Sequence, residues 1–157
     1  IDVLNGLTDE FKERIIFSTH PRIRKRIEAE RVSLSPLVEM HKPFSFSDYV
    51  RLELGAIAVL SDSGTITEES SILNFPALNI REAHERPEGM EEGAVMMVGF
   101  DLEKIIQALN VTRNQSKGDT RILKMVKDYD VPNVSEKILR IIISYIAYIK
   151  RNVWKES

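Results

Sequence analysis

The sequence predicts an α/β protein in which a parallel sheet is covered by helices on both faces. Its 157 residues fit one ordinary domain with a sizeable core. Short apolar runs alternate with helical patterns, as expected of repeated βαβ units. The apolar runs lack in–out alternation, which is typical of strands buried on both faces. We therefore expect an open, doubly wound, Rossmann-like sheet.

Five apolar runs have the length of buried strands. They cover residues 14–19, 32–38, 56–62, 76–80 and 95–100. The segments between them carry helical patterns, at residues 21–30, 47–54, 65–74, 86–92 and 101–110. Pro21 stands at the favoured first position of the first of these helices. Residues 1–11 have a helical pattern from the first residue on, so we expect the chain to be a piece of a longer protein.

The C-terminal part has a different character. Residues 111–130 are polar and contain glycine, and we expect a mobile loop there. Ser135 is a plausible N-cap for a long amphipathic helix over 135–157. The apolar surface of this helix is wide, so we expect it to pack against another domain. The predicted ligand-binding domain is then 1–134.

Composition narrows the possible functions. The chain has 22 basic and 24 acidic side chains, a net charge of −2, so we expect no nucleic-acid partner. It contains no cysteine, which excludes disulfides, thiolate metal sites and a cysteine nucleophile and favours a cytoplasmic setting. The most apolar run, 138–149, is shorter than the roughly 20 residues that span a bilayer, so we expect no membrane partner. We expect neither a metal nor a cofactor.

The turn after the third predicted strand is the strongest candidate site. The sequence "SDSGTITEE" places Ser63, Gly64 and Thr65 where a strand gives way to a helix. In open α/β sheets ligands bind at this edge, and hydroxyls beside a helix N-terminus suit a phosphate. A capping box formed by Thr65 and Glu68 would explain the same residues without a ligand. Both interpretations stay open from these residues alone.

Two further features favour a ligand. Glu69 lies about 100° round the helix from Glu68, where a carboxylate behind a phosphate-binding turn is placed to accept hydrogen bonds from a ribose. The loop after the fourth strand emerges at the same edge and contains arginines suited to oxyanions. Its charged residues are Arg81, Glu82, His84, Glu85, Arg86 and Glu88. We expect Arg86 to contact the ligand.

Together, the "SDSGTITEE" turn, the following strand and the "ERPE" loop resemble the C-terminal domain of the non-hydrolysing UDP-N-acetylglucosamine 2-epimerase family. The resemblance implies the C-terminal half of a GT-B-type two-domain enzyme, with a UDP-sugar substrate and a cleft between the halves. The family's second glycine is Thr65 here. With the closing helix, that departure resembles the branch that makes UDP-N-acetyl-L-fucosamine for capsule or O-antigen.

The resemblance also implies roles for individual residues. Ser63, Gly64 and Thr65 would hold the diphosphate and Glu69 the ribose. Pro43 and Phe44 match the segment that brackets uracil. Tyr49 aligns with an aromatic that lies against the base, although a core role is the alternative. His20 matches a catalytic histidine near the diphosphate and sugar, and the dipole of the helix that it precedes would favour a neutral ring.

The family reaction inverts C2 of the sugar by anti elimination and re-addition of UDP. The resemblance places most catalytic carboxylates in the N-terminal domain, which this sequence lacks, so we expect the isolated chain to be inactive. The complete enzyme would be a homodimer. Two rival functions remain: a GT-B glycosyltransferase donor domain, and a non-catalytic nucleotide-sugar-binding module.

Overall fold

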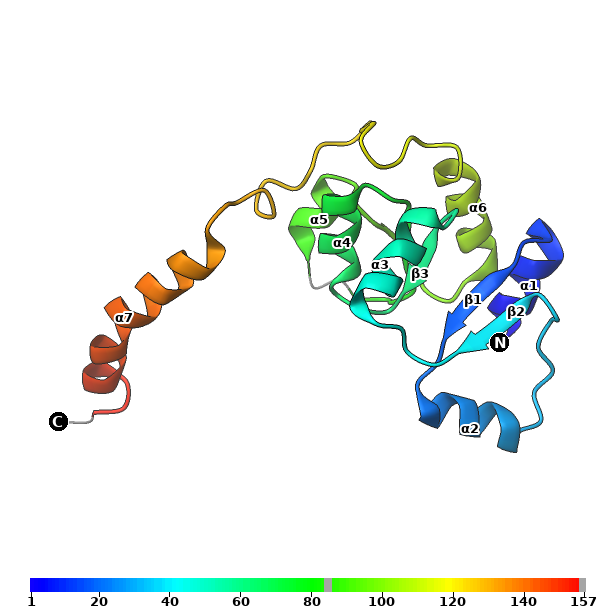
Figure 1. Cartoon of the computed structure of the whole chain (residues 1–157), viewed down its shortest axis with the longest axis horizontal. Helices are drawn as coiled ribbons and strands as arrows, with labels where there is room; N and C mark the ends of the chain where they lie inside the picture. The colour runs from blue at the N-terminus through cyan, green and yellow to red at the C-terminus, as the bar shows by residue number, and fades with distance from the viewer. Residues whose placement is uncertain (84–85, 156–157) are drawn as a thin grey trace. The chain divides into compact units, whose positions relative to one another are not determined.

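The computed structural model describes residues 1–83 and 86–155, and Figure 1 shows the order of the elements. The strands are β1 (Ile15–Ser18), β2 (Val38–His41), β3 (Val59–Ser61), β4 (Ala77–Asn79) and β5 (Met96–Met97). The helices are α1 (Asp2–Phe11), α2 (Pro21–Ala29), α3 (Phe46–Gly55), α4 (Ile66–Leu73), α5 (Pro87–Glu91), α6 (Leu102–Thr112) and α7 (Val134–Asn152). Helices and strands alternate from α1 to α6, which confirms the predicted α/β class.

All described strands pair in parallel, as predicted. β1 pairs with β2, and β4 lies between β3 and β5. Within residues 1–83 and 86–155 the strands therefore form two groups, rather than the single continuous sheet that the alternation suggested. In both groups the C-terminal ends of neighbouring strands meet at one edge, where the loops to α2, α3 and α4 begin.

The second strand is displaced from its predicted position. The apolar run 32–38 overlaps β2 only at Val38. Pro36 has no N–H group for a ladder, and Ser35 instead forms a turn in which its carbonyl oxygen accepts from Val38 N over 2.9 Å. The side chain of Asn5 also holds this segment, since its Oδ1 accepts from Ser35 N over 2.8 Å. The strand begins where these bonds end, although half of its residues are polar.

The helix starts follow local chemistry in most cases. Pro21 occupies the first turn of α2, as predicted, and the side chain of Ser45 caps α3. The Oδ1 atom of Asp101 accepts from two backbone amides at the start of α6. The prediction that Ser135 caps the long helix is wrong, because Asn133, in a left-handed conformation, precedes α7 and makes no side-chain cap bond.

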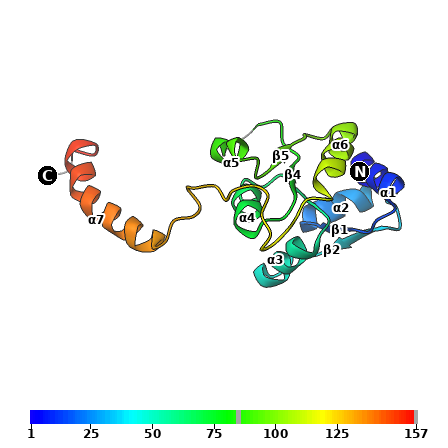
Figure 2. The same ribbon diagram turned by 90° about the horizontal axis from the view of Figure 1, so that it is seen from above.

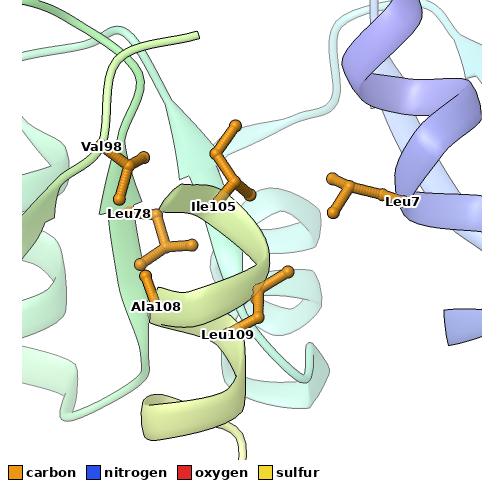
Figure 3. Close-up of a cluster of buried hydrophobic side chains, with 6 residues drawn as sticks. All are labelled: Leu7, Leu78, Val98, Ile105, Ala108 and Leu109. Carbon is orange, nitrogen blue, oxygen red and sulfur yellow. The ribbon is translucent and has the colours of Figure 1, made fainter. Parts of the chain in front are cut away.

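The core is built on both faces of β4. Leu78 is fully buried and contacts the α6 side chains Ile105, Ala108 and Leu109 (Figure 3). Ala77, its neighbour along the strand, belongs to a second cluster with Ile66 of α4. Successive strand residues point to opposite faces, so α6 and α4 cover opposite sides of this sheet (Figure 2). This explains why every residue of β4 is buried.

The segment after α6 is anchored to the C-terminal end of α4. Asn74, which ends α4 in a left-handed conformation, donates from Nδ2 to the carbonyl oxygens of Gly118 (2.8 Å) and Thr120 (3.0 Å). Arg121 donates to the carbonyl oxygens of Ser71 and Ile72 at the end of that helix. These bonds satisfy carbonyls that a helix leaves unpaired at its end. The mobility of residues 111–130 remains a prediction.

Residues 127–157 form a unit of their own, which contains α7. No described residue of α7 is buried, and its exposed apolar side chains include Ile138, Leu139, Ile142, Tyr145 and Ile146. Tyr145 and Tyr148 stack edge to face, with ring centroids 6.2 Å apart. Where this helix packs remains a prediction. Among the described residues, no helix is long and apolar enough to span a membrane.

Candidate functional site

The turn between β3 and α4 presents two hydroxyl groups side by side. The Oγ atom of Ser63 lies 2.9 Å from Oγ1 of Thr65, and both residues are exposed. Ser63 Oγ also accepts from Thr65 N over 3.3 Å, so the hydroxyl oxygen faces the amides that open α4. Hydroxyls and backbone amides at a helix N-terminus are the groups that bind phosphate oxygens in proteins. The turn thus has the composition of an anion site.

The capping-box alternative is not formed. Thr65 is the N-cap of α4, but its side chain makes no cap hydrogen bond. Glu68 does not reach back to the N-cap, because its Oε1 accepts from Arg86 Nε over 2.7 Å. This ion pair joins the start of α5 to the first turn of α4, and both side chains are about one-third exposed. Arg86 therefore contacts the first turn of α4, and its Nε donates to Glu68.

The glycine in the turn has an ordinary backbone. Among the described residues, the glycines with positive φ are Gly93, Gly99 and Gly118. The sharp turn predicted at Gly64 therefore does not need a left-handed conformation. The absence of a side chain remains useful at Gly64, since it lets a ligand approach the backbone closely.

Glu69 faces an acidic partner on the neighbouring helix. It begins the second turn of α4, where its N–H donates to Thr65 O over 2.9 Å. Its carboxyl group lies near that of Glu53 on α3, whose side chain is only 2% exposed. Burial, together with the negative charge of Glu69, raises the pKa of Glu53 to about 7. Near neutral pH this site therefore holds fewer than two negative charges.

Tyr49 belongs to the same cluster. It stands one helical turn before Glu53, and its half-buried hydroxyl lies within reach of the Glu53 carboxyl group. Burial raises the pKa of Tyr49, and the nearby carboxylates of Glu53 and Glu69 raise it further. Tyr49 is therefore a neutral hydrogen-bond donor close to Glu69.

His20 ends the loop after β1 and is the N-cap of α2. Its Nδ1 accepts from Arg22 N over 3.3 Å, so this nitrogen carries no proton. The proton of a neutral ring then lies on Nε2. The residue is exposed at the edge where β1 ends. With Nδ1 as the acceptor, Nε2–H is the donor that a neutral ring presents at this edge; the neutral ring expected from the helix dipole remains a prediction.

Pro43 lies beside a hollow of about 320 Å³ at the ends of β1 and β2. Its lining residues are Thr19, Pro21, Arg24, Lys25, Glu28, Lys42 and Pro43. Phe44, the next residue, is half-buried, and its ring lies 5.4 Å from the ring of His41. The predicted uracil segment is thus next to a concave surface lined by three basic residues and one acidic residue.

The predicted residues form two groups. Ser63, Gly64, Thr65 and Glu69 surround the start of α4, and Arg86 is tied to them through Glu68. The second group, at the ends of β1 and β2, contains His20, Pro43 and Phe44. Tyr49 lies near Glu53 and Glu69 of the first group, and its predicted role beside the base remains a prediction. His84 and Glu85, named in the charged loop, lie outside the described residues.

Sequence reasoning missed Glu53. A glutamate within "DYVRLEL" reads as part of the solvated face of an amphipathic helix, and its burial depends on the packing of α3 near α4. The signal that could have found it is the spacing from Tyr49, since residues i and i+4 share a helix face. An acidic residue on the same face as a half-buried tyrosine is a candidate for burial.

The comparison with protein families decides the assignment. Residues 1–143 match the family model described as UDP-N-acetylglucosamine 2-epimerase. The chain belongs to this epimerase family. A relative named UDP-N-acetylglucosamine 2-epimerase from Methanocaldococcus jannaschii is 33% identical over 111 residues. That alignment covers 68% of this chain but 30% of the relative, so this chain spans about a third of that protein's length.

Solved structures of family members have the same architecture. A UDP-N-acetylglucosamine 2-epimerase from Rickettsia bellii is 48% identical, with a TM-score of 0.86, over 99% of this chain and 43% of that one. The Methanocaldococcus jannaschii enzyme, solved in complex with UDP-GlcNAc and UDP, is 29% identical, with a TM-score of 0.76. The match covers 91% of this epimerase-family chain and 40% of the Methanocaldococcus jannaschii chain. The α/β class is therefore shared across the family.

Proposed function

We propose that this chain is the UDP-binding half of a nucleotide-sugar 2-epimerase. The observation that carries the proposal is the start of α4, where the hydroxyls of Ser63 and Thr65 meet at 2.9 Å and Glu69 follows one turn later. This spacing provides donors for a diphosphate and an acceptor for a ribose on one helix end. Membership of the epimerase family and similarity to a chain solved with UDP-GlcNAc and UDP support the nucleotide.

In the proposed complex the turn stabilises negative charge on the diphosphate. When UDP leaves the sugar, negative charge develops on the diphosphate. Hydroxyl and amide donors that are already oriented at Ser63, Gly64 and Thr65 stabilise that charge without reorganisation. The positive end of the α4 dipole adds to the effect. Arg86 supports the turn through Glu68, and the ion pair keeps the loop after β4 beside α4.

The second group of residues would bind the base and the sugar end. Pro43 and Phe44 offer main-chain groups and a ring for uracil beside the hollow at the ends of β1 and β2. His20 would use Nε2–H to contact the diphosphate or sugar, since Nδ1 is bonded to Arg22 N. We assign Tyr49 a supporting place near the ribose carboxylate, where its hydroxyl lies.

The proposed reaction inverts C2 of a UDP-2-acetamido sugar. UDP is eliminated anti to the C2 proton, a 2-acetamidoglycal forms, and UDP adds back after the double bond is protonated on the other face. Thr65 in place of the family's second glycine supports the branch that converts UDP-2-acetamido-2,6-dideoxy-L-talose into UDP-N-acetyl-L-fucosamine. The enzyme would act in the cytoplasm, in the synthesis of capsule or O-antigen.

The base that removes the C2 proton would come from another part of the enzyme. We propose that this part is an N-terminal domain that closes over residues 1–134, and that the helix within 135–157 packs across the interface in a GT-B-type pair. The exposed apolar side chains of α7 support such a contact. The complete enzyme would be a homodimer, and this chain alone would not turn over.

The test uses a longer protein that joins this chain to its other half, in D₂O. It is supplied separately with UDP-N-acetylglucosamine and with UDP-2-acetamido-2,6-dideoxy-L-talose, and NMR follows the product. The proposal expects inversion with one deuterium at C2, faster with the talose sugar. A glycosyltransferase would move the sugar with its C2 hydrogen retained, and a binding module would leave both sugars unchanged. Either result would overturn the epimerase assignment.

A further inference from the structure

Glu53 is a buried carboxyl group that the family assignment leaves without a role. It lies in the last turns of α3, and its side chain is 2% exposed. Neither Oε1 nor Oε2 has a hydrogen-bond partner of good geometry among the described residues. Such a group is costly to bury, because each lost hydrogen bond to water must be replaced. An uncompensated buried carboxyl group therefore calls for an explanation.

Two groups face Glu53. Tyr49 stands one turn earlier on α3, and Glu69 faces it from α4, which runs beside α3 in Figure 1. Both are close enough to perturb its ionisation, and burial and Glu69 act in the same direction, against the charged form. The three side chains thus form one cluster, with Glu53 at its buried end and Glu69 at its half-buried end.

We propose that Glu53 is a positioning residue whose protonated carboxyl group donates a hydrogen bond to Glu69 and orients it toward the ribose hydroxyls of the ligand. The inference rests on the proposed function, since it takes Glu69 as the ribose-binding group. It adds to that function a residue that does not touch the ligand and acts through another side chain.

The chemistry of the pair supports this role. Glu69 must present lone pairs to two neighbouring hydroxyls, which requires a fixed rotamer. Glu69 is half-buried near the start of α4 and lies close to Tyr49 and Glu53. If both Glu53 and Glu69 were ionised, their carboxylates would repel each other and turn Glu69 away. A protonated Glu53 instead binds the inner oxygen of Glu69 and leaves the outer one for ribose.

The experiment compares wild type with Glu53→Gln and Glu53→Leu. Glutamine keeps a donor at the same place, whereas leucine keeps the volume and removes the donor. Each protein is titrated at about pH 6 with UDP and with 2′,3′-dideoxy-UDP, which lacks the ribose hydroxyls. Independently, ¹³C NMR follows the carboxyl carbon of Glu53 against pH in wild type and in Glu69→Gln, without nucleotide.

The inference expects Glu53→Leu to bind UDP about tenfold more weakly while its affinity for dideoxy-UDP is unchanged, and Glu53→Gln to bind both like wild type. It expects the pKa of Glu53 to fall in Glu69→Gln, because the negative charge of Glu69 is one of the causes that raise it in wild type. A buried Glu53 with a merely structural role, out of contact with Glu69, would titrate alike in both proteins.

Different results would contradict the positioning role of Glu53 and the ribose-binding role of Glu69. If wild type binds UDP and Glu53→Leu retains full ribose discrimination, the positioning role is wrong and the proposed function stands. If Glu53 titrates identically in wild type and Glu69→Gln, the positioning role is wrong whatever the affinities are; this comparison does not need the leucine variant to fold. If wild type prefers UDP no more than dideoxy-UDP, the ribose assignment of Glu69 fails, and the role of Glu53 fails with it.

Discussion

Arg86 donates from Nε to Oε1 of Glu68 over 2.7 Å, and this bond ties the loop after β4 to the first turn of α4. The two residues are 18 positions apart in sequence, on the two motifs that carried the family resemblance. The contact joins the two motifs in space: one contains the proposed diphosphate turn, and the other contacts the first turn of the helix that follows it.

A double-mutant cycle measures this contact. Glu68→Ala and Arg86→Ala each remove one partner of a partly exposed ion pair, so we expect a coupling free energy of about 1 kcal/mol in urea unfolding. The coupling should shrink at high salt, because exposed charges are screened. The cycle cancels the other interactions of Arg86. A coupling near zero, with Glu68→Ala still destabilising, would show that Glu68 acts as a helix cap instead.

Glu69 is predicted to matter for UDP and little for the fold. Glu69→Ala removes two hydrogen bonds to ribose, and bonds to a charged acceptor are worth about 1.5–3 kcal/mol each. We expect UDP affinity to fall by at least about tenfold while the urea midpoint changes little. Glu68→Ala is the matched control, since it removes a carboxylate one residue away. Equal loss of affinity in both variants would contradict the ribose assignment.

The raised pKa of Glu53 makes stability depend on pH. The carboxyl group titrates near 4.5 in the unfolded chain and near 7 in the fold, so the fold binds more protons between these values. The free energy of unfolding therefore falls as pH rises from about 4.5 to 7, by at most about 3 kcal/mol. Glu53→Gln should lack this part of the fall. Parallel stability curves for the two proteins would contradict the burial of an ionisable group there.

Leu78 tests the core between β4 and α6. Its side chain is fully buried against Ile105, and Leu78→Ala should lower the free energy of unfolding by about 2–5 kcal/mol. Ile143→Ala is the control, because Ile143 on α7 is 66% exposed and its loss should cost less than about 0.5 kcal/mol. Denaturant unfolding of both variants checks the pair. Similar losses would show that α7 contributes to the same cooperative unit.

The sequence predicted what depends on local pattern. Uninterrupted apolar runs such as residues 76–80 became buried strands, and Pro21 began a helix, because period and proline geometry act over a few residues. The strand near 32–38 was misplaced because hydrogen bonds from the distant Asn5 hold that segment in a turn. The cap at Ser135 was wrong because Asn133 supplied a left-handed backbone earlier in the chain.

In the candidate site, too, local pattern predicted some features, and others depend on tertiary packing. Motif spacing placed Ser63, Thr65 and Glu69 on one helix end, which local geometry determines. Burial of Glu53 and the pairing of Glu68 with Arg86 depend on which helices meet, and no short-range pattern encodes that. The capping box was compatible with the sequence, and the bond from Arg86 to Glu68, together with the missing cap bond of Thr65, decided against it.

The central claim is that uridine nucleotides bind at the start of α4. The most direct measurement is a residue-by-residue NMR titration of this chain with UDP and, separately, with ADP. The account predicts shifts with UDP at Ser63, Gly64, Thr65 and Glu69, smaller shifts at Phe44 and Tyr49, and weak or no shifts with ADP. Equal shifts with both nucleotides, or shifts confined to residues outside this turn, would contradict it.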